Sequence, residues 1–131
     1  MLATADLIAF IPTTDLARAR AFYVDLLGLP VKADTPFACV LDAAGTMVRV
    51  TPVDVLPPRP YTVLGWAVDD IDAAVRQLGG RGLAFSRFDG VDQDRVGVWT
   101  APGGDQIAWF TDPDGNTLSL TQFAAGDEPA S

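Results

Sequence analysis

The sequence contains no histidine, one cysteine and one lysine. Without histidine, Ser-His-Asp and Cys-His catalytic groups and His-ligated zinc or iron sites are excluded. The single Cys39 cannot form a disulfide within the chain, which favours a reducing compartment, so we expect a cytoplasmic protein in which Cys39 is a buried, inert thiol. The apolar stretch Leu7–Ile11 is too short for a signal-peptide core or a membrane span, so we expect no membrane partner.

Positive charge is also scarce. The 131 residues include 9 Lys and Arg against 17 Asp and Glu, which gives a formal net charge of −8. Because no basic patch is available to release counterions, we expect no nucleic-acid partner. The hydrophobic share of 49% and the charged share of 20% indicate a folded chain rather than a disordered one, and the length predicts a single domain.

The same order of elements occurs twice along the chain. The hydrophobic patterns of the first copy predict a strand, a helix and a hairpin over Leu7–Ile11, Leu16–Leu27, Ala38–Leu41 and Thr46–Thr51. Those of the second copy predict a strand, a helix, a hairpin and a last strand over Val63–Val68, Ile71–Leu78, Arg95–Thr100, Gln106–Thr111 and Asn116–Gln122. Asp15 (or Thr14) and Asp70 are the expected N-caps, and the two aspartates lie 55 residues apart. Gly28 and Gly79-Gly80 are the expected helix stops.

These patterns predict an α+β fold. Two βαβββ modules are expected to form a curved mixed sheet around a cleft, with the helices on the convex side, because neither module can bury its helix and sheet alone. The expected boundaries are module one at about 5–53, a proline-rich linker at about 54–60, module two at about 61–123 and a frayed tail at 124–131. The concave side of such a sheet is a common place for a small ligand.

Three motifs resemble those of a known family. DLARARAFYVDLLGL (15–29), VDDID (68–72) and the turn FTDPDGN (110–116) resemble the signature segments of the vicinal oxygen chelate superfamily, which includes glyoxalase I, bleomycin-resistance proteins and extradiol dioxygenases. The resemblance covers about residues 5–123. These motifs specify the fold and say little about the chemistry.

The resemblance also implies where a metal would be held. Metal-dependent members of the superfamily use His, Gln or Glu at one position on each of four strands. The matching positions here are Ile8, a position within one residue of Arg49, Val63 and Ser119. Two apolar side chains, a cation and a neutral hydroxyl do not suit a divalent ion, so we expect no metal, no cofactor and no catalytic residue of the family type.

Strand alternation predicts which side chains line the cleft. They are apolar, aromatic and hydroxyl side chains with one guanidinium: Ile8, Phe10, Met47, Arg49, Val63, Trp99, Trp109, Ser119 and Thr121. Arg49 either forms a salt bridge with an acidic residue or meets an anionic group of the ligand. Trp99 and Trp109 either stack on a planar ligand or pack in the core or a dimer interface.

The resemblance therefore implies a metal-free protein of the drug-binding and resistance branch, which binds a small hydrophobic or aromatic molecule in its cleft as a homodimer. The alternative is a superfamily enzyme of the lyase, isomerase or dioxygenase type, with a non-standard metal site or none. A third interpretation is a structural or interaction protein without a ligand. The acidic balance would suit a cationic ligand and Arg49 an anionic one, and the sequence leaves both open.

Overall fold

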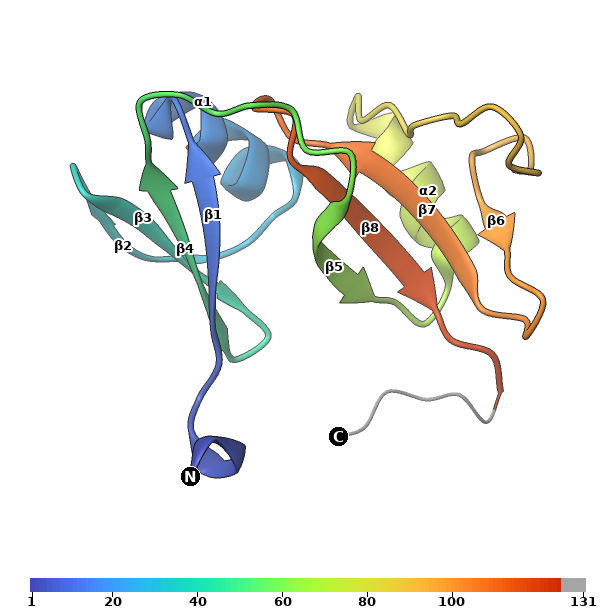
Figure 1. Ribbon diagram of the computed structural model, residues 1–131, viewed down its shortest axis with the longest axis horizontal. Helices are drawn as coiled ribbons and strands as arrows, with labels where there is room; N and C mark the ends of the chain where they lie inside the picture. The colour runs from blue at the N-terminus through green and yellow to red at the C-terminus, as the bar shows by residue number, and fades with distance from the viewer. Residues whose placement is uncertain (126–131) are drawn as a thin grey trace. The chain divides into compact units, whose positions relative to one another are not determined.

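The computed structural model describes residues 1–125, and its contacts divide the chain into two compact units, Met1–Pro58 and Arg59–Ser131. Each unit contains one four-stranded mixed sheet and follows the order strand, helix, three strands (Figure 1). The predicted α+β fold of two βαβββ modules is confirmed. The part of the expected tail that covers residues 126–131 lies outside the described residues.

The first unit is built around the sheet β1-β4-β3-β2, in which β1 pairs with β4 in parallel and the other pairs are antiparallel. Its elements are a 3-10 helix Leu2–Thr4, β1 (Ile8–Thr13), α1 (Leu16–Arg20), a π-helical segment η2 (Ala21–Leu26), β2 (Val31–Thr35), β3 (Ala38–Ala43) and β4 (Thr46–Pro52). Ile11, Tyr23, Leu41, Val48 and Val50 form its buried core.

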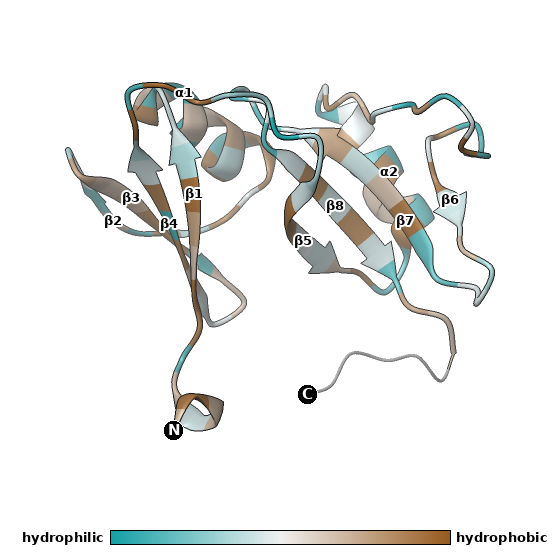
Figure 2. Ribbon diagram, in the orientation of Figure 1, coloured by the Kyte–Doolittle hydropathy of each residue, from teal (hydrophilic) through white to brown (hydrophobic). Residues whose placement is uncertain are grey.

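The second unit repeats this plan with the sheet β5-β8-β7-β6, in which β5 and β8 are parallel. Its elements are β5 (Thr62–Ala67), α2 (Ile71–Gly80), β6 (Trp99–Thr100), β7 (Gln106–Thr111) and β8 (Thr117–Gln122). Ile71 and Val75 of α2 are buried in a core with Phe110 and Leu118, which lie on adjacent positions of β7 and β8. Figure 2 shows the alternation of hydrophobic and more polar positions along β8 that produces one covered and one uncovered face.

Both predicted N-caps are confirmed. A side-chain oxygen of Asp15 accepts a hydrogen bond from the Arg18 amide at 3.1 Å, and Asp70 accepts one from the Ala73 amide at 3.1 Å. Gly28 follows the first helical segment with a φ of 82°, in the left-handed region that favours glycine at a helix end. Within the described part of the chain, no helix combines the length and the hydropathy needed to span a membrane.

Most predicted strands have bounds that shift by one or two residues, and β2 (Val31–Thr35) was not among the predicted elements. Three other differences concern the two helices and one strand. The helix expected over 16–27 changes from α to π at Ala21, and α2 continues through Gly79-Gly80 to end before Gly82, whose φ is 99°. The strand expected over 95–100 is reduced to Trp99–Thr100. There the Asp94 carboxylate accepts hydrogen bonds from the amides of Val96 and Val98 and holds the backbone in a turn.

Candidate functional site

The uncovered face of the first sheet brings together four of the predicted residues. In the parallel pair of β1 and β4, Ile8 lies opposite Met47 and Phe10 lies opposite Arg49. The relative exposures of Phe10, Ile8 and Met47 are 62%, 45% and 39%, whereas Val48 on the other face of β4 is buried. Alternation along the two strands therefore presents apolar side chains to solvent around Arg49.

Arg49 lies on the central strand of this sheet and is half-buried between Phe10 on β1 and Val40 on β3. Among the described residues, its side chain makes no hydrogen bond and no ion pair. The salt bridge expected as one alternative thus has no partner in residues 1–125. A half-buried guanidinium in this position retains its capacity to donate hydrogen bonds to an anionic group.

A cavity of about 500 Å³ lies beside Ile8 and Met47 within the first unit. Its lining also includes Asp6, Lys32 and Asp42, so it carries charges of both signs next to an apolar wall. Cavities that hold small organic molecules begin at roughly 300 Å³. The space beside this face is thus large enough for a small molecule.

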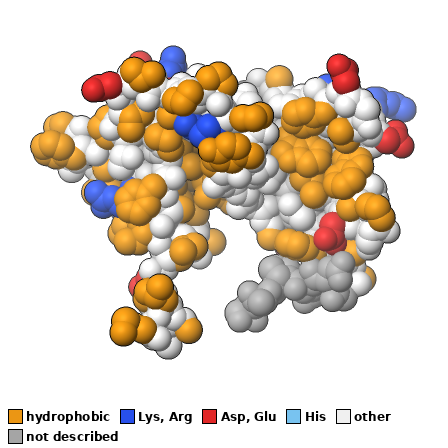
Figure 3. Space-filling model, viewed as in Figure 1, with side chains coloured by type: hydrophobic (Ala, Val, Ile, Leu, Met, Phe, Trp, Pro, Cys, Tyr) orange, Lys and Arg blue, Asp and Glu red, His pale blue; other side chains and the backbone are white. Residues whose placement is uncertain are grey.

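The uncovered face of the second sheet brings together four more predicted residues. Trp109 of β7 lies opposite Ser119 of β8, and Ile107 lies between Thr121 on β8 and Trp99 on β6. Figure 1 views this sheet from the side opposite to α2, and Figure 3 shows hydrophobic side chains gathered over β7 and β6 in the same view.

The aromatic rings on this face form a group. The ring centroids of Trp99 and Trp109 are 6.0 Å apart with an interplanar angle of 32°, and Phe88 meets Trp109 edge-on at 5.4 Å. An opening of about 450 Å³ lies beside Trp99, with Asp92 and Asp94 also in its lining. Half-buried indole rings of this kind can stack on a planar molecule.

Val63 is a predicted site residue that does not share the regular strand pairing of the others. β5 is irregular between Thr62 and Leu64, so Val63 has no partner on β8, and Gly65 lies opposite Ser119 instead. A Cβ atom on Gly65 would lie 2.7 Å from Ser119 Oγ. Sequence reasoning missed Gly65, although a glycine inside a strand signals a bulge or a close approach of another group.

The residues at the family's metal positions do not fit a divalent cation. Ile8 and Val63 offer no donor atom, Arg49 is cationic, and Ser119 is buried with its hydroxyl beside Gly65. Within residues 1–125, no three His, Cys, Asp or Glu side chains gather in a group able to hold a metal ion. No step of chemistry is therefore derived through a metal here.

Comparison with known proteins agrees with this fold. Residues 4–120 match the family model of the Glyoxalase/Bleomycin resistance protein/Dioxygenase superfamily, while no curated protein sequence matches the chain. A superfamily member from Sphaerobacter thermophilus is 26% identical with a TM-score of 0.71, over 94% of this chain and 100% of that one. TnmS3, an antibiotic binding protein from Streptomyces sp. CB03234, is 27% identical with a TM-score of 0.66, over 95% and 99%.

A more distant structure carries an enzyme's name. Lactoylglutathione lyase from Agrobacterium tumefaciens is 17% identical with a TM-score of 0.67, over 91% of this chain and 93% of that one, which shows a shared fold alone. The strand order, the helix caps and the match to most of the sequence agree with one another. The chain belongs to the Glyoxalase/Bleomycin resistance protein/Dioxygenase superfamily.

Proposed function

We propose that this protein binds a small hydrophobic or aromatic molecule without using a metal ion. The observation that carries the proposal is the group formed by Trp99, Trp109 and Phe88 on the face of the second sheet opposite to α2 (Figure 1). When a planar molecule covers exposed aromatic area of this kind, the burial of apolar surface favours binding. Thr121 on the same face supplies a hydroxyl group that can fix the orientation of such a molecule, whereas Ser119 is buried against Gly65.

The side chains at the family's metal positions support binding rather than metal-dependent catalysis. Apolar and cationic groups at Ile8, Arg49 and Val63 favour contact with the body or the charge of an organic molecule. The similarity to an antibiotic binding protein supports the same class of function, namely sequestration of a drug-like compound. A metal-dependent enzyme would need a site that the donor atoms of residues 1–125 do not supply, so the alternative that remains is an enzyme acting without a metal.

Two further properties belong to this proposal. We infer that the working form is a homodimer, supported by large exposed apolar side chains such as Phe10, Phe37 and Tyr61. Sedimentation analysis should give twice the chain mass of 13.9 kDa, and a monomer at all concentrations would contradict this. We infer a cytoplasmic location, supported by the single cysteine, which is free and buried.

Intrinsic tryptophan fluorescence tests the binding proposal. A panel of planar aromatic antibiotics should include compounds that quench the fluorescence saturably, because Trp99 and Trp109 lie on the proposed contact face. Trp66 stacks on the buried Phe110 with ring centroids 6.3 Å apart and serves as the internal reference. The double variant Trp99→Phe, Trp109→Phe should lose the saturable response. A wild-type protein that responds to no compound would refute the proposal.

A further inference from the structure

Another cavity lies in the second unit, on the side of the sheet that α2 covers. Its volume is about 300 Å³, and three arginines contribute to its lining, namely Arg76 of α2 with Arg87 and Arg95 of the segment that precedes β6. The chain has nine cationic residues and a net charge of −8. One third of these cationic residues contribute to the lining of this one opening. No acidic residue of the described chain is part of this lining. We call this opening the arginine cavity.

The wall of the arginine cavity is apolar. Val75 of α2 and Leu83 are buried, and Phe85 meets the buried Phe110 edge-on with ring centroids 5.6 Å apart. These side chains belong to the core between α2 and the covered face of the sheet. An occupant therefore meets hydrocarbon surface on one side and guanidinium groups on the other.

The guanidinium groups of Arg87 and Arg95 are not neutralised by described carboxylates. Arg87 Nη2 donates to the Arg95 carbonyl oxygen at 2.7 Å, and Nη1 donates to the Gln93 carbonyl oxygen at 3.5 Å. Carbonyl oxygens fix the orientation of Arg87 without cancelling its charge. The Arg95 side chain has no hydrogen bond or ion pair among residues 1–125.

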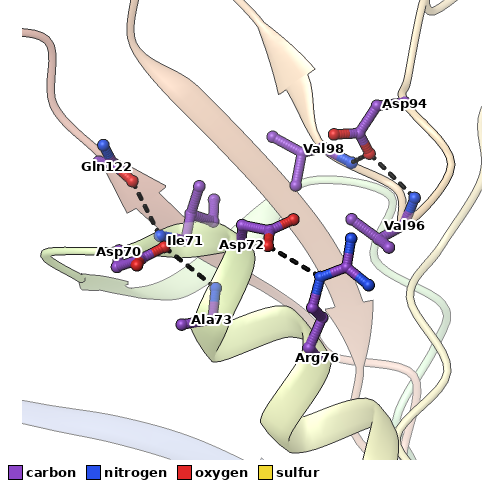
Figure 4. Close-up of polar contacts among 9 residues, drawn as sticks. All are labelled: Asp70, Ile71, Asp72, Ala73, Arg76, Asp94, Val96, Val98 and Gln122. Carbon is purple, nitrogen blue, oxygen red and sulfur yellow. Dashed lines mark hydrogen bonds and ion pairs between the residues drawn. The ribbon is translucent and has the colours of Figure 1, made fainter.

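The third guanidinium is held by one carboxylate. Arg76 Nε donates to Asp72 Oδ2 at 2.8 Å, which raises the pKa of Arg76 and keeps it charged (Figure 4). The nearby Asp94 turns one carboxylate oxygen to the amides of Val96 and Val98 at 3.0 and 2.9 Å (Figure 4). Among residues 1–125, an ion pair balances the charge of Arg76 but not the charges of Arg87 and Arg95.

We propose that the arginine cavity binds a small amphipathic anion, with a carboxylate or phosphate group between the guanidiniums and an apolar body against Val75, Leu83 and Phe85. Arginine suits both anionic groups because its planar fork donates two parallel hydrogen bonds. This site is separate from the aromatic group of the same unit. Phe110 and Trp109 are neighbours on β7 and face opposite sides of the sheet, so Phe85 and Trp99 lie on different faces.

An NMR titration of the full chain tests this inference with phenyl phosphate and phenylacetate as probes. Saturable shifts are expected at the amides of Arg76, Phe85 and Arg95, and the tighter probe identifies the preferred anionic group. Inorganic phosphate should bind more weakly because it lacks the apolar body. Benzyl alcohol should also bind more weakly, because it lacks the anionic group. The variant Trp99→Phe should bind as the wild type does, which separates this site from the proposed function.

The matched variants are Arg95→Gln and Arg18→Gln. The Arg95 side chain makes no hydrogen bond or ion pair among residues 1–125, so its replacement should leave the fold intact. It should weaken the binding of phenyl phosphate roughly tenfold, the order expected for a lost charged hydrogen bond. Arg18 is an exposed arginine of α1 and its replacement should change little. Absence of saturable shifts with both anions, or equal affinity of the Arg95 variant and the wild type, would overturn the proposal.

Discussion

Arg49 is the residue on the exposed face of the first sheet that could bind an anionic group. Its guanidinium is half-buried beside Phe10 and without a described partner. We expect Arg49→Ala to weaken 2-naphthalenesulfonate binding by roughly 1–3 kcal/mol and to leave the neutral 2-naphthol unaffected, since only the anion uses the hydrogen bonds. Isothermal titration calorimetry measures both, with Arg18→Ala as the control. Unchanged affinity together with lower stability would assign Arg49 a structural role instead.

Gly65 and Ser119 lie so close together that a larger residue at position 65 would displace the serine side chain. The Gly65→Ala side chain would place its Cβ 2.7 Å from Ser119 Oγ, so the serine side chain must move. We expect a loss of about 1–3 kcal/mol in the free energy of unfolding, the range for overpacking. Urea unfolding measures it. In the Ser119→Ala background the same change should cost much less, and an equal cost in both backgrounds would contradict the assigned clash.

Ionisation of Cys39 should make the stability of the folded protein decrease slightly at alkaline pH. Burial raises the pKa of the Cys39 thiol, Asp34 raises it further, and Arg20 opposes them. The unfolded chain therefore loses this proton first as the pH rises past the ordinary thiol value of about 8.5. Stability should be complete below that pH and decline above it, until the folded thiol also ionises. Cys39→Ala should flatten this decline in urea unfolding between pH 8 and 10, and equal slopes would contradict the account.

At the scale of the element, the start of α2 depends on two side chains. Asp70 caps the helix through the Ala73 amide, and Gln122 Oε1 of β8 accepts a hydrogen bond from the Ile71 amide at 2.8 Å (Figure 4). Asp70→Ala should lower the free energy of unfolding by about 1 kcal/mol. The exposed neighbour Asp69 makes no described hydrogen bond, so Asp69→Ala is the matched control. Equal effects of the two variants would show that charge, not capping, matters here.

The elements could be predicted wherever local chemistry fixes the backbone. Asp15 and Asp70 marked the helix starts, and the 112–115 turn is held by the Gly115 amide donating to the Asp112 carbonyl oxygen at 3.0 Å. The π-helical segment Ala21–Leu26 could not be predicted, because apolar spacing of three and four residues is common to α and π geometry. The short β6 was missed because the hydrogen bonds of Asp94 compete with strand pairing.

The residues of the candidate site could be predicted in part for a similar reason. Alternation along a strand is a local rule, so Phe10 with Arg49 and Trp109 with Ser119 fall on shared faces as expected. Val63 does not follow, because a bulge depends on pairing with a strand more than 50 residues away in sequence. The arginine cavity was also missed, since its walls come from a helix and an irregular segment.

At the scale of the whole molecule, family membership fixes the fold but not the activity. One fold can carry catalysis, drug binding or neither, so the function depends on the side chains of the uncovered faces. In this chain those faces carry apolar, aromatic and hydroxyl groups with one guanidinium, and the described acids form no metal-holding group. The proposed binding of an organic molecule would use these groups directly.

The proposed function requires that this protein recognise an organic molecule with its own side chains, unaided by a bound metal. Elemental analysis of the purified chain, paired with fluorescence titration before and after EDTA treatment, measures this most directly. We predict far less than one divalent ion per chain and the same affinity for the aromatic probe in both samples. One tightly held divalent ion per chain, with probe binding lost on its removal and restored on its return, would contradict the claim.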